Sequence, residues 1–363
     1  MLRVGLIGTG VALRTHLPGF RRTGQAEVVG LVGSSLERAT HFARQHNILQ
    51  VYSDYQELCE ADDIDLIVVA SPNSFHHQQV KYALQQGKHV LAEKPLAMNL
   101  QEIEELVELA ANSDRLALID HQLRFSPYMQ TIKEHIQEGK LGRLYFIRFH
   151  FQGGSSDPQR AFDWHFDESM GGGVRLAMAS HLTDLLWFWL ESRKVYNVHG
   201  RMDSLVPQRK DATGQQKEVT TSGFFTAHIS LEDNLEVQMS DTMAFGESQF
   251  TIALYGTRGE LYFDAQCGLE GAFVGGESMQ PIAVDMQNLE QARPDASIFR
   301  QSFDLFARQI VRSLQSGDHK HIPDAAHFQD AVPTQRVLDA IRHSTLSGEV
   351  IQLSEGYRPG ASS

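Results

Sequence analysis

The chain has 363 residues, with 32 Lys and Arg against 45 Asp and Glu, which gives a net charge of −13. An excess of negative charge repels nucleic-acid phosphates and anionic lipids, so neither is expected as a main partner. Hydrophobic residues make up 42% of the chain, which is enough for the packed cores of about two domains.

The cysteines and the apolar segments give no indication of export or membrane insertion. Cys59 and Cys267 lack the spacing of a disulfide framework or a zinc site, which favours a reducing, cytoplasmic location. Glycine interrupts the apolar start at residues 1–7, and no small-residue cleavage site follows it. The apolar stretch 185–190 is too short to span a bilayer. We therefore expect a soluble, cytoplasmic protein.

The first 122 residues alternate between short apolar runs and helix-like segments. Such runs without polar alternation are typical of strands buried on both faces, and helices between consecutive strands require a parallel sheet. The sequence therefore predicts a doubly wound, Rossmann-like α/β domain over residues 1–122. Its expected strands are 4–7, 28–32, 66–70, 89–92 and 116–119, and its expected helices are 11–22, 36–46, 76–86 and 100–112.

From residue 123 onward, most of the predicted strands follow one another without helices between them. That pattern indicates an antiparallel sheet, so residues 123–363 are expected to form an α/β domain with a large, open, mostly antiparallel sheet. The expected strands are 143–152, 195–201, 223–231, 235–242, 249–255 and 260–263; the expected helices are 127–139, 180–190, 297–315 and 324–343; the expected loops are 207–216 and 268–293. We expect the last helix to pack back toward the first domain.

One face of this second sheet is expected to lack a helical cover. An exposed apolar sheet face usually marks an interface, so the sequence predicts a homo-oligomer, a dimer or a tetramer, formed through it.

A glycine-rich turn lies where the first strand gives way to the first helix. Glycines at Gly8 and Gly10 permit a tight turn and let the backbone approach a pyrophosphate, which the free N–H groups of the helix start would bind. Leu13 stands where the dinucleotide-binding fingerprint has its third glycine, a position that serves helix packing. The residues expected to contact the phosphates are Gly8, Thr9, Gly10, Val11 and Ala12.

The end of the second strand bears on the choice of nicotinamide cofactor. NAD-binding domains usually carry an acidic residue there for the ribose 2′-hydroxyl, whereas this chain has Gly33. Ser34, Ser35 and Arg38 would instead suit a 2′-phosphate, which favours NADP(H) and leaves NAD(H) possible. The alternative is that Ser35 only caps the following helix while Arg38 is solvated.

The fourth apolar run leads into Glu93-Lys94-Pro95. A lysine at the carboxyl end of a parallel strand lies where such sheets bind ligands, and it could exchange a proton with a substrate oxygen during hydride transfer. Together with this motif, several other segments make the chain resemble the Gfo/Idh/MocA oxidoreductases over essentially its whole length. These segments are the glycine turn, Ser71-Pro72-Asn73 with His76, residues 87–90, 124–127, 139–142 and 171–173, and His181.

The resemblance implies a Rossmann domain, a C-terminal domain with an open antiparallel sheet, and oxidation or reduction of a sugar, polyol or related compound with NAD(P). Lys94 matches the family's catalytic lysine, and His181 is expected to assist with the proton. The remaining cofactor contacts implied are Ser71, Pro72, Asn73, His76, Glu93 and Lys94. The expected substrate contacts are Lys94, Gln122, Arg124, Trp164, His165, Ala177 and His181.

One position departs from the family pattern. The family commonly has an aspartate four residues before its histidine, where this chain has Ala177 before His181. Three explanations are open: Lys94 and His181 suffice, Asp163 or Asp167 supplies the acid, or the site binds nucleotide without catalysis. The leading hypothesis is an NADP-preferring sugar or polyol oxidoreductase, and the alternative is a non-catalytic NADP(H)-binding or sensor protein. No metal site is expected, since the histidines at 319 and 321 lack further ligands in the sequence.

Overall fold

The computed structural model describes residues 1–153, 160–191, 193–243, 247–276, 278–286, 297–317 and 321–353. The chain divides into two compact units, one formed by Met1–Ser126 with Met286–Val332 and the other by Pro127–Asp285 with Pro333–Ser363. The predicted second domain, 123–363, therefore includes a segment that the structure groups with the first unit. Within the described ranges, no helix is long and apolar enough to cross a bilayer.

The first unit is built on a seven-stranded sheet in the order β17-β6-β5-β4-β1-β2-β3. All neighbours pair in parallel except β17, which is antiparallel to β6. The strands are β1 (Leu2–Ile7), β2 (Ala26–Val32), β3 (Gln50–Val51), β4 (Leu66–Val69), β5 (His89–Ala92), β6 (Ala117–Ile119) and β17 (Ala326–His327). Chain order reverses between β1 and β4, which is where doubly wound sheets bind their ligands.

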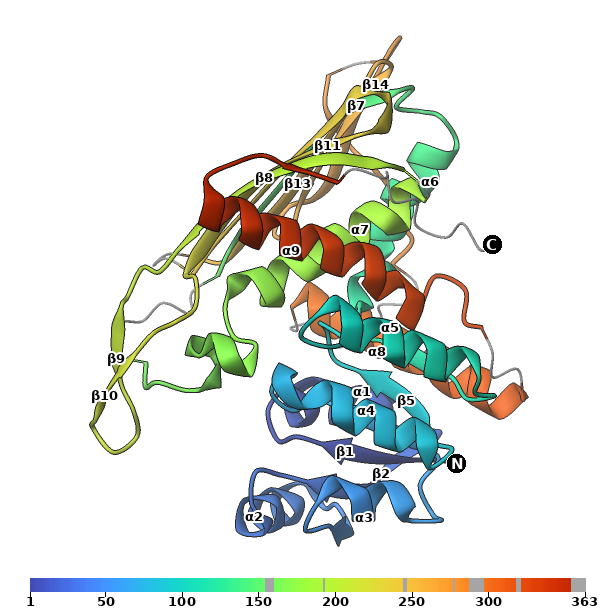
Figure 1. Cartoon of the computed structure of the whole chain (residues 1–363). Helices are drawn as coiled ribbons and strands as arrows, with labels where there is room; N and C mark the ends of the chain where they lie inside the picture. The colour runs from blue at the N-terminus through green and yellow to red at the C-terminus, as the bar shows by residue number, and fades with distance from the viewer. Residues whose placement is uncertain are drawn as a thin grey trace. The chain divides into compact units, whose positions relative to one another are not determined.

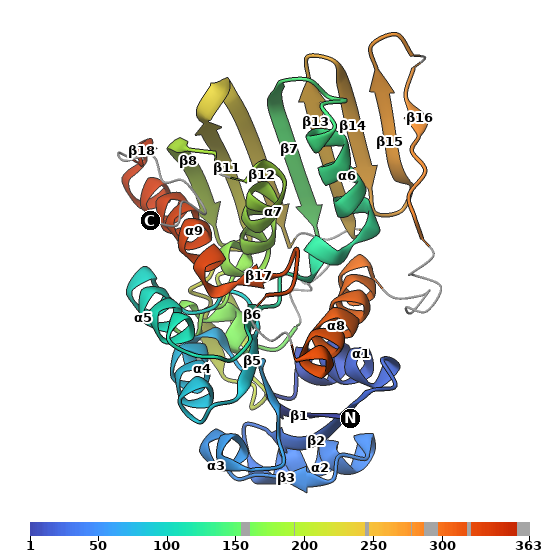
Figure 2. The same cartoon turned by 90° about the vertical axis from the view of Figure 1, so that its right-hand side faces the viewer.

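Helices cover both faces of this sheet (Figures 1 and 2). On one face η1 (Ala12–His16), α1 (Leu17–Arg22), α2 (Leu36–His46) and α8 (Ile298–Ser316) enclose an apolar core. On the other face α3 (Tyr55–Glu60), α4 (His76–Gln85) and α5 (Leu100–Ala111) enclose a second. The 3₁₀ segments η2 (Asn73–Phe75), η3 (Gln122–Phe125) and η8 (Phe328–Asp330) complete the unit. The predicted doubly wound α/β fold is confirmed.

The second unit is built on a nine-stranded sheet in the order β16-β15-β14-β13-β7-β12-β11-β8-β18. Only β12 and β7 pair in parallel among its described strands, so the predicted open, mostly antiparallel sheet is confirmed. The strands are β7 (Leu144–Gln152), β8 (Val195–Asp203), β11 (Phe224–Leu231), β12 (Leu235–Thr242), β13 (Gln249–Gly256), β14 (Gly259–Asp264), β15 (Gly268–Phe273), β16 (Gln280–Pro281) and β18 (Ile351–Gln352).

Three helices, α6 (Pro127–Gln137), α7 (Ser180–Leu190) and α9 (Ala331–Ser347), lie on one face of this sheet (Figure 2). Trp189 of α7 stacks on Phe149 of β7, with ring centroids 5.8 Å apart. Against β8, α9 packs so closely that a Cβ on Gly200 would lie 3.0 Å from the Cα of Ile341. Shorter 3₁₀ or π segments are η4 (Trp164–Phe166), η5 (Glu168–Met170), η6 (Arg175–Ala179) and η7 (Glu232–Asn234).

The opposite face of the sheet, which the sequence led us to expect to be apolar, has a polar row at its centre. The central cross-strand row on that face is His199, His228, Gln238, Arg148 and Ala253, all brought together by strand pairing. Polar side chains dominate this row because the strands alternate, and the apolar partners of each pair face the helices. This row is therefore polar, and the same face also carries the stacked aromatic pair Phe146 and Tyr255.

Three segment assignments from the sequence are also wrong. The expected loop 207–216 contains β9 (Gln208–Lys210), which pairs with β10 (Gln216–Glu218), and the expected loop 268–293 contains β15 and β16 within its described part. The last helix begins at Ala331, not at 324, because residues 326–327 join the first unit's sheet as β17. Local patterns carry little information about such short strands, since distant partners stabilise them.

Candidate active site

The candidate site of the first unit lies at the carboxyl edge of its parallel sheet. There the strand ends are tied to one another by backbone hydrogen bonds: Ala70 N–H donates to Ile7, Glu93 N–H to Val69 and Asp120 N–H to Ala92, each at 2.8 Å. The residues that follow β1, β4, β5 and β6 are thus fixed side by side. The segments expected to bind the cofactor are among them.

The two glycines of the phosphate turn have different roles. Gly8 has φ +116°, and a Cβ there would lie 2.3 Å from the carbonyl oxygen of Ala70, so it permits close contact between β1 and β4. A Cβ on Gly10 would meet no atom within 4 Å. The space over Gly10 is therefore open to a ligand, as a pyrophosphate site requires. Val11 and Ala12 follow at the start of a π-helical turn, η1, with Val11 as its N-cap residue.

At the end of β2, the structure shows the cap that one sequence interpretation expected and an additional contact of Arg38. Ser35 caps α2, because its Oγ accepts from the Arg38 N–H at 3.2 Å. The exposed Arg38 side chain also reaches the phosphate turn, where its Nε donates to Thr9 Oγ1 at 3.3 Å. Ser34 is exposed beside them. A cationic and hydroxyl-bearing surface thus adjoins the glycine turn.

Lys94 follows β5 in a segment that is otherwise closed to solvent. Every residue from His89 to Ala97 is buried except Lys94, which is partly exposed. Its charge acts on three neighbours, lowering the pKa of Glu93, His76 and His121. Lys94 is therefore held at the edge of the sheet among other titratable groups.

His76 binds the backbone on both sides of the site. Its Nδ1 lies 2.9 Å from the Pro95 carbonyl oxygen and its Nε2 lies 3.0 Å from that of Ser71. Burial lowers its pKa, so the ring is neutral and donates to one carbonyl at a time. Ser71 donates to Gln79 at 2.6 Å, and Pro72 and the buried Asn73 lead into η2. These residues connect the end of β4 with the Glu93-Lys94-Pro95 motif.

The segment after β6 supplies two residues expected to contact substrate. Gln122 is buried, and its Oε1 accepts no hydrogen bond from any residue that the structure describes. Arg124 is also buried; its Nη1 donates to the Ala325 carbonyl at 3.3 Å and pairs with Asp330 at 3.4 Å. Arg124 thus fastens the chain around β17 to the first unit.

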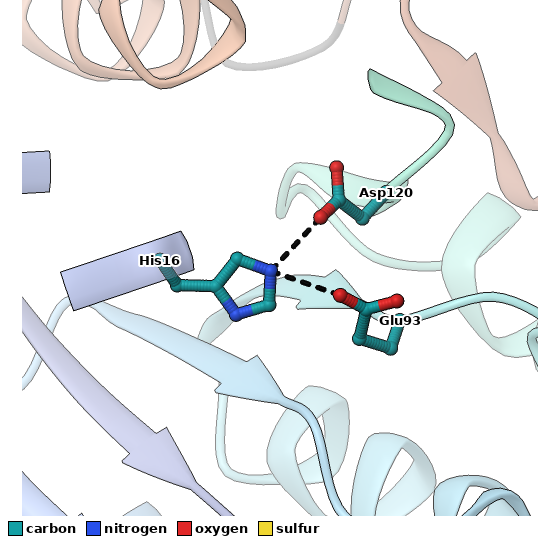
Figure 3. Close-up of side chains that lie close together, drawn as sticks. All are labelled: His16, Glu93 and Asp120. Carbon is teal, nitrogen blue, oxygen red and sulfur yellow. Dashed lines mark hydrogen bonds and ion pairs between the residues drawn. The ribbon is translucent and has the colours of Figure 1, made fainter. Parts of the chain in front are cut away.

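Sequence reasoning did not identify the buried group formed by His16, Glu93 and Asp120 (Figure 3). His16 Nε2 lies 2.8 Å from Asp120 Oδ2 and 3.0 Å from Glu93 Oε1. Burial alone would lower the pKa of His16, but the two carboxylates outweigh it and raise this pKa to about 9. Glu93, expected at the cofactor, is thus engaged with His16. The signal available in the sequence was the position of His16, four residues after Ala12 and four before Phe20, on the buried face of its helix.

In the second unit, Trp164 and His165 form η4 and stack on one another, with ring centroids 3.9 Å apart. Asp163 accepts from His165 Nδ1 at 2.7 Å and from Arg160 at 2.8 Å. Burial alone would raise the pKa of Asp163, but these hydrogen bonds hold it well below its usual range. Asp167 caps η5. The two acids considered as substitutes at position 177 therefore have local structural roles.

Ala177 and His181 lie on continuous helical structure that changes type between them. Ala177 is in the π-helical η6 and is partly exposed, whereas His181 is buried in the first turn of α7. Asp184, one turn further, is also buried. π-helical turns are uncommon and are frequent at functional sites, and this chain has one after the phosphate turn and one before His181.

The parallel sheet, the open turn at Gly10 and the lysine at the sheet edge together define a dinucleotide-binding oxidoreductase fold. Comparison with protein families agrees: residues 2–121 match an oxidoreductase family with an NAD-binding Rossmann fold, and residues 129–262 match the GFO/IDH/MocA C-terminal domain. The chain belongs to the GFO/IDH/MocA oxidoreductase family, and it has the fold that binds a nicotinamide cofactor.

Individual relatives cover most of the chain. It is 26% identical to a 1,5-anhydro-D-fructose reductase of Ensifer adhaerens over 98% of this chain and 100% of that protein. It is 29% identical to an uncharacterized oxidoreductase of Synechocystis over 72% of this chain and 71% of that protein. A levoglucosan dehydrogenase, solved with NADH and levoglucosan, superposes with a TM-score of 0.87 at 21% identity, covering 98% of this chain and all of that one.

The same substitution is expected to affect ligand binding at Gly10 and fold stability at Gly8. Gly10→Ala should leave the melting temperature nearly unchanged and weaken NADPH binding about tenfold or more, because the new Cβ enters the space open to the pyrophosphate. Gly8→Ala should destabilise the fold by about 1–3 kcal/mol or more through strain against Ala70. Thermal unfolding and fluorescence titration measure both, and a Gly10→Ala variant with wild-type NADPH affinity would contradict the assignment.

Proposed function

We propose that the protein is an NADP(H)-preferring oxidoreductase that acts on a sugar, polyol or related carbonyl compound. The observation that carries this proposal is the placement of Lys94. It is the partly exposed residue of a buried segment at the same sheet edge as the open phosphate turn. The relative named as a 1,5-anhydro-D-fructose reductase supports the substrate class. When bound, the nicotinamide supplies or accepts the hydride.

The chain's own residues would handle the oxygen and the proton. Lys94 would hydrogen-bond the substrate oxygen and give it a proton during reduction, or receive one during oxidation. His181 would assist this transfer as a neutral or protonated imidazole, without the aspartate that the family pattern has at position 177. Gln122, with a buried Oε1 that can accept a hydrogen bond, suits a substrate hydroxyl. Trp164, His165 and Arg124 complete the proposed substrate set.

Removal of the lysine tests the proposed chemistry. Lys94→Ala should lower kcat by about 10²–10⁴-fold, the usual effect of losing a general acid–base group, and should leave NADPH affinity within a few-fold. Lys81→Ala is the matched control, since Lys81 is also a partly exposed lysine and pairs with Glu105. Steady-state assays on a panel of sugars and polyols measure kcat. A fully active Lys94→Ala variant would remove the lysine from the mechanism.

The same assays separate catalysis from mere nucleotide binding. Ala177 motivates the alternative of a non-catalytic NADP(H)-binding or sensor protein. Tight NADPH binding by the wild-type chain, with no turnover of any compound in the panel, would favour that alternative.

The preference for NADP(H) is proposed from Arg38, which is exposed at the end of β2 and reaches Thr9. Arg38→Ala should weaken NADPH binding about tenfold or more, because a charge-assisted contact to a 2′-phosphate contributes about 1.5–3 kcal/mol. NADH binding should change by less than about threefold, since NADH lacks that phosphate. Arg44→Ala, an exposed arginine in the last turn of α2, is the control. Equal losses for the two cofactors would refute the preference.

We also propose a cytoplasmic homo-oligomer that associates through the sheet face opposite α6, α7 and α9. The partly exposed, stacked pair Phe146 and Tyr255 on that face, with ring centroids 5.9 Å apart, supports the interface. The two free cysteine thiols support the location in the cytoplasm. Light scattering at micromolar concentration should show a dimer or a larger species, and Phe146→Glu should dissociate it. A monomeric wild-type chain would contradict this proposal.

A further inference from the structure

His16, Glu93 and Asp120 come from three separate segments and meet inside the first unit (Figure 3). His16 ends the π-helical turn that follows the phosphate turn, Glu93 directly precedes Lys94, and Asp120 directly follows β6. The side chains of His16 and Asp120 are fully buried, and that of Glu93 is nearly so. A single imidazole nitrogen therefore contacts two carboxylates inside the protein.

We propose that His16 is a positioning residue for Lys94. Its Nε2 hydrogen-bonds Asp120 at 2.8 Å and forms an ion pair with Glu93 Oε1 at 3.0 Å. This bridge holds the Glu93-Lys94 segment to the helix that follows the phosphate turn. The inference rests on the proposed function, because Lys94 matters here as the group that exchanges a proton with the substrate.

The distances match direct contacts between His16 and the two carboxylates better than a tetrahedral zinc site. All three ligand atoms lie within 4.8 Å of one another, a spacing that could hold a cation. Tetrahedral zinc, bound at about 2.0–2.1 Å, would separate neighbouring ligand atoms by about 3.3 Å. The observed separations are shorter: His16 Nε2 lies 2.8 Å from Asp120, a hydrogen bond, and 3.0 Å from Glu93, an ion pair. The ring of Phe303 further covers His16, with centroids 4.7 Å apart.

The charges also fit a protonated ring. Two buried carboxylates repel one another, and an imidazolium between them offsets that repulsion. Burial alone would raise the pKa of Glu93, but His16 and Lys94 lower it. Burial, with the charge of Glu93 adding to it, raises the pKa of Asp120 to about 6. At neutral pH the group therefore consists of one cation and two anions.

Other charged groups surround the three residues. Lys94 and His76 act on Glu93, and His121, next to Asp120, is subject to Arg124, Lys94, Asp330 and Glu93. On α8, next to Phe303, the buried Asp304 lies 3.7 Å from Arg22. Burial lowers the pKa of His76 and of His121, so both are neutral near pH 7. The titration expected between pH 5 and 7 within the group therefore belongs to Asp120.

Three variants of the full chain test the bridge: His16→Gln, Asp120→Asn and the double variant H16Q/D120N. A neutral glutamine in place of His16 would leave two carboxylates without a cation, so His16→Gln should lower kcat about 10–100-fold while the Kd for NADPH changes less than about threefold. The double variant removes the repulsion, since its net charge in the group equals that of the wild type. It should recover at least about fivefold in kcat over His16→Gln. His41→Gln, at an exposed histidine of α2, is the control.

The pH profile of kcat distinguishes this role from a purely structural one, since a His16 that served only packing would leave the profile unchanged on substitution. The wild type should lose activity below about pH 6, as Asp120 gains a proton. In His16→Gln this limb should move to higher pH, because loss of the cation raises the pKa of the carboxylates. In Asp120→Asn and in the double variant the limb should be absent.

Nitrogen-15 NMR of histidine-labelled wild-type protein tests the charge without any assay of activity. One signal, shifted in Asp120→Asn, should remain that of an imidazolium at pH 8, where unperturbed histidines are neutral. This measurement and the Asp120→Asn profile decide the question if His16→Gln fails to fold.

Several results would overturn the proposal: a His16→Gln variant with wild-type kcat and pH profile, a double variant no better than His16→Gln, a neutral ring at pH 8, or stoichiometric metal retained after treatment with EDTA. A fully active Lys94→Ala would instead overturn the proposed function. An inactive Lys94→Ala together with a fully active His16→Gln would overturn the positioning role alone.

Discussion

The structure of the first unit depends on the close approach of β1 to β4 at Gly8. No side chain fits there, because a Cβ would lie 2.3 Å from the carbonyl oxygen of Ala70. From this point the backbone hydrogen bonds of Ala70, Glu93 and Asp120 tie each strand end to the next. The phosphate turn, the lysine motif and the buried acid after β6 thus share one rigid edge, and a change in the β1–β4 contact would displace all of them.

Local sequence patterns predicted the helices and strands whose formation depends on residues close to them in the sequence. The helix 36–46 and the strand 89–92 were predicted to the residue, since a serine cap marks one and a continuous apolar run marks the other. Helix α8 was predicted too, but its place beside α1 was not, because it joins the first unit across more than 270 residues of sequence. Strand β15, with Gly268 and Gly271, resembles a loop in composition, although a Cβ at Gly271 would lie 2.8 Å from Leu261.

The residues of the candidate site also fall into those that the local sequence predicts and those that depend on distant contacts. The turn at Gly8 and Gly10 and the position of Lys94 follow from where strands end, which the sequence displays. The role of Arg124 does not, because its partner Asp330 is 206 residues away. His16 and Asp120 are separated by 104 residues, and only the folded sheet brings them together. Each residue carried a weak signal: His16 lies on the apolar face of a helix, and Asp120 directly follows a buried strand. Neither signal identifies the partner.

The neighbours of Lys94 differ in charge. Burial lowers the pKa of His76 and His121, which are therefore neutral and place no positive charge beside the ammonium group. Glu93 is ionised because His16 and Lys94 both lower its pKa. Lys94 thus faces one anion and two neutral rings from these three residues. In the proposed reaction, a negative neighbour suits the ammonium group of Lys94, which would give a proton to a substrate oxygen as hydride reaches the adjacent carbon.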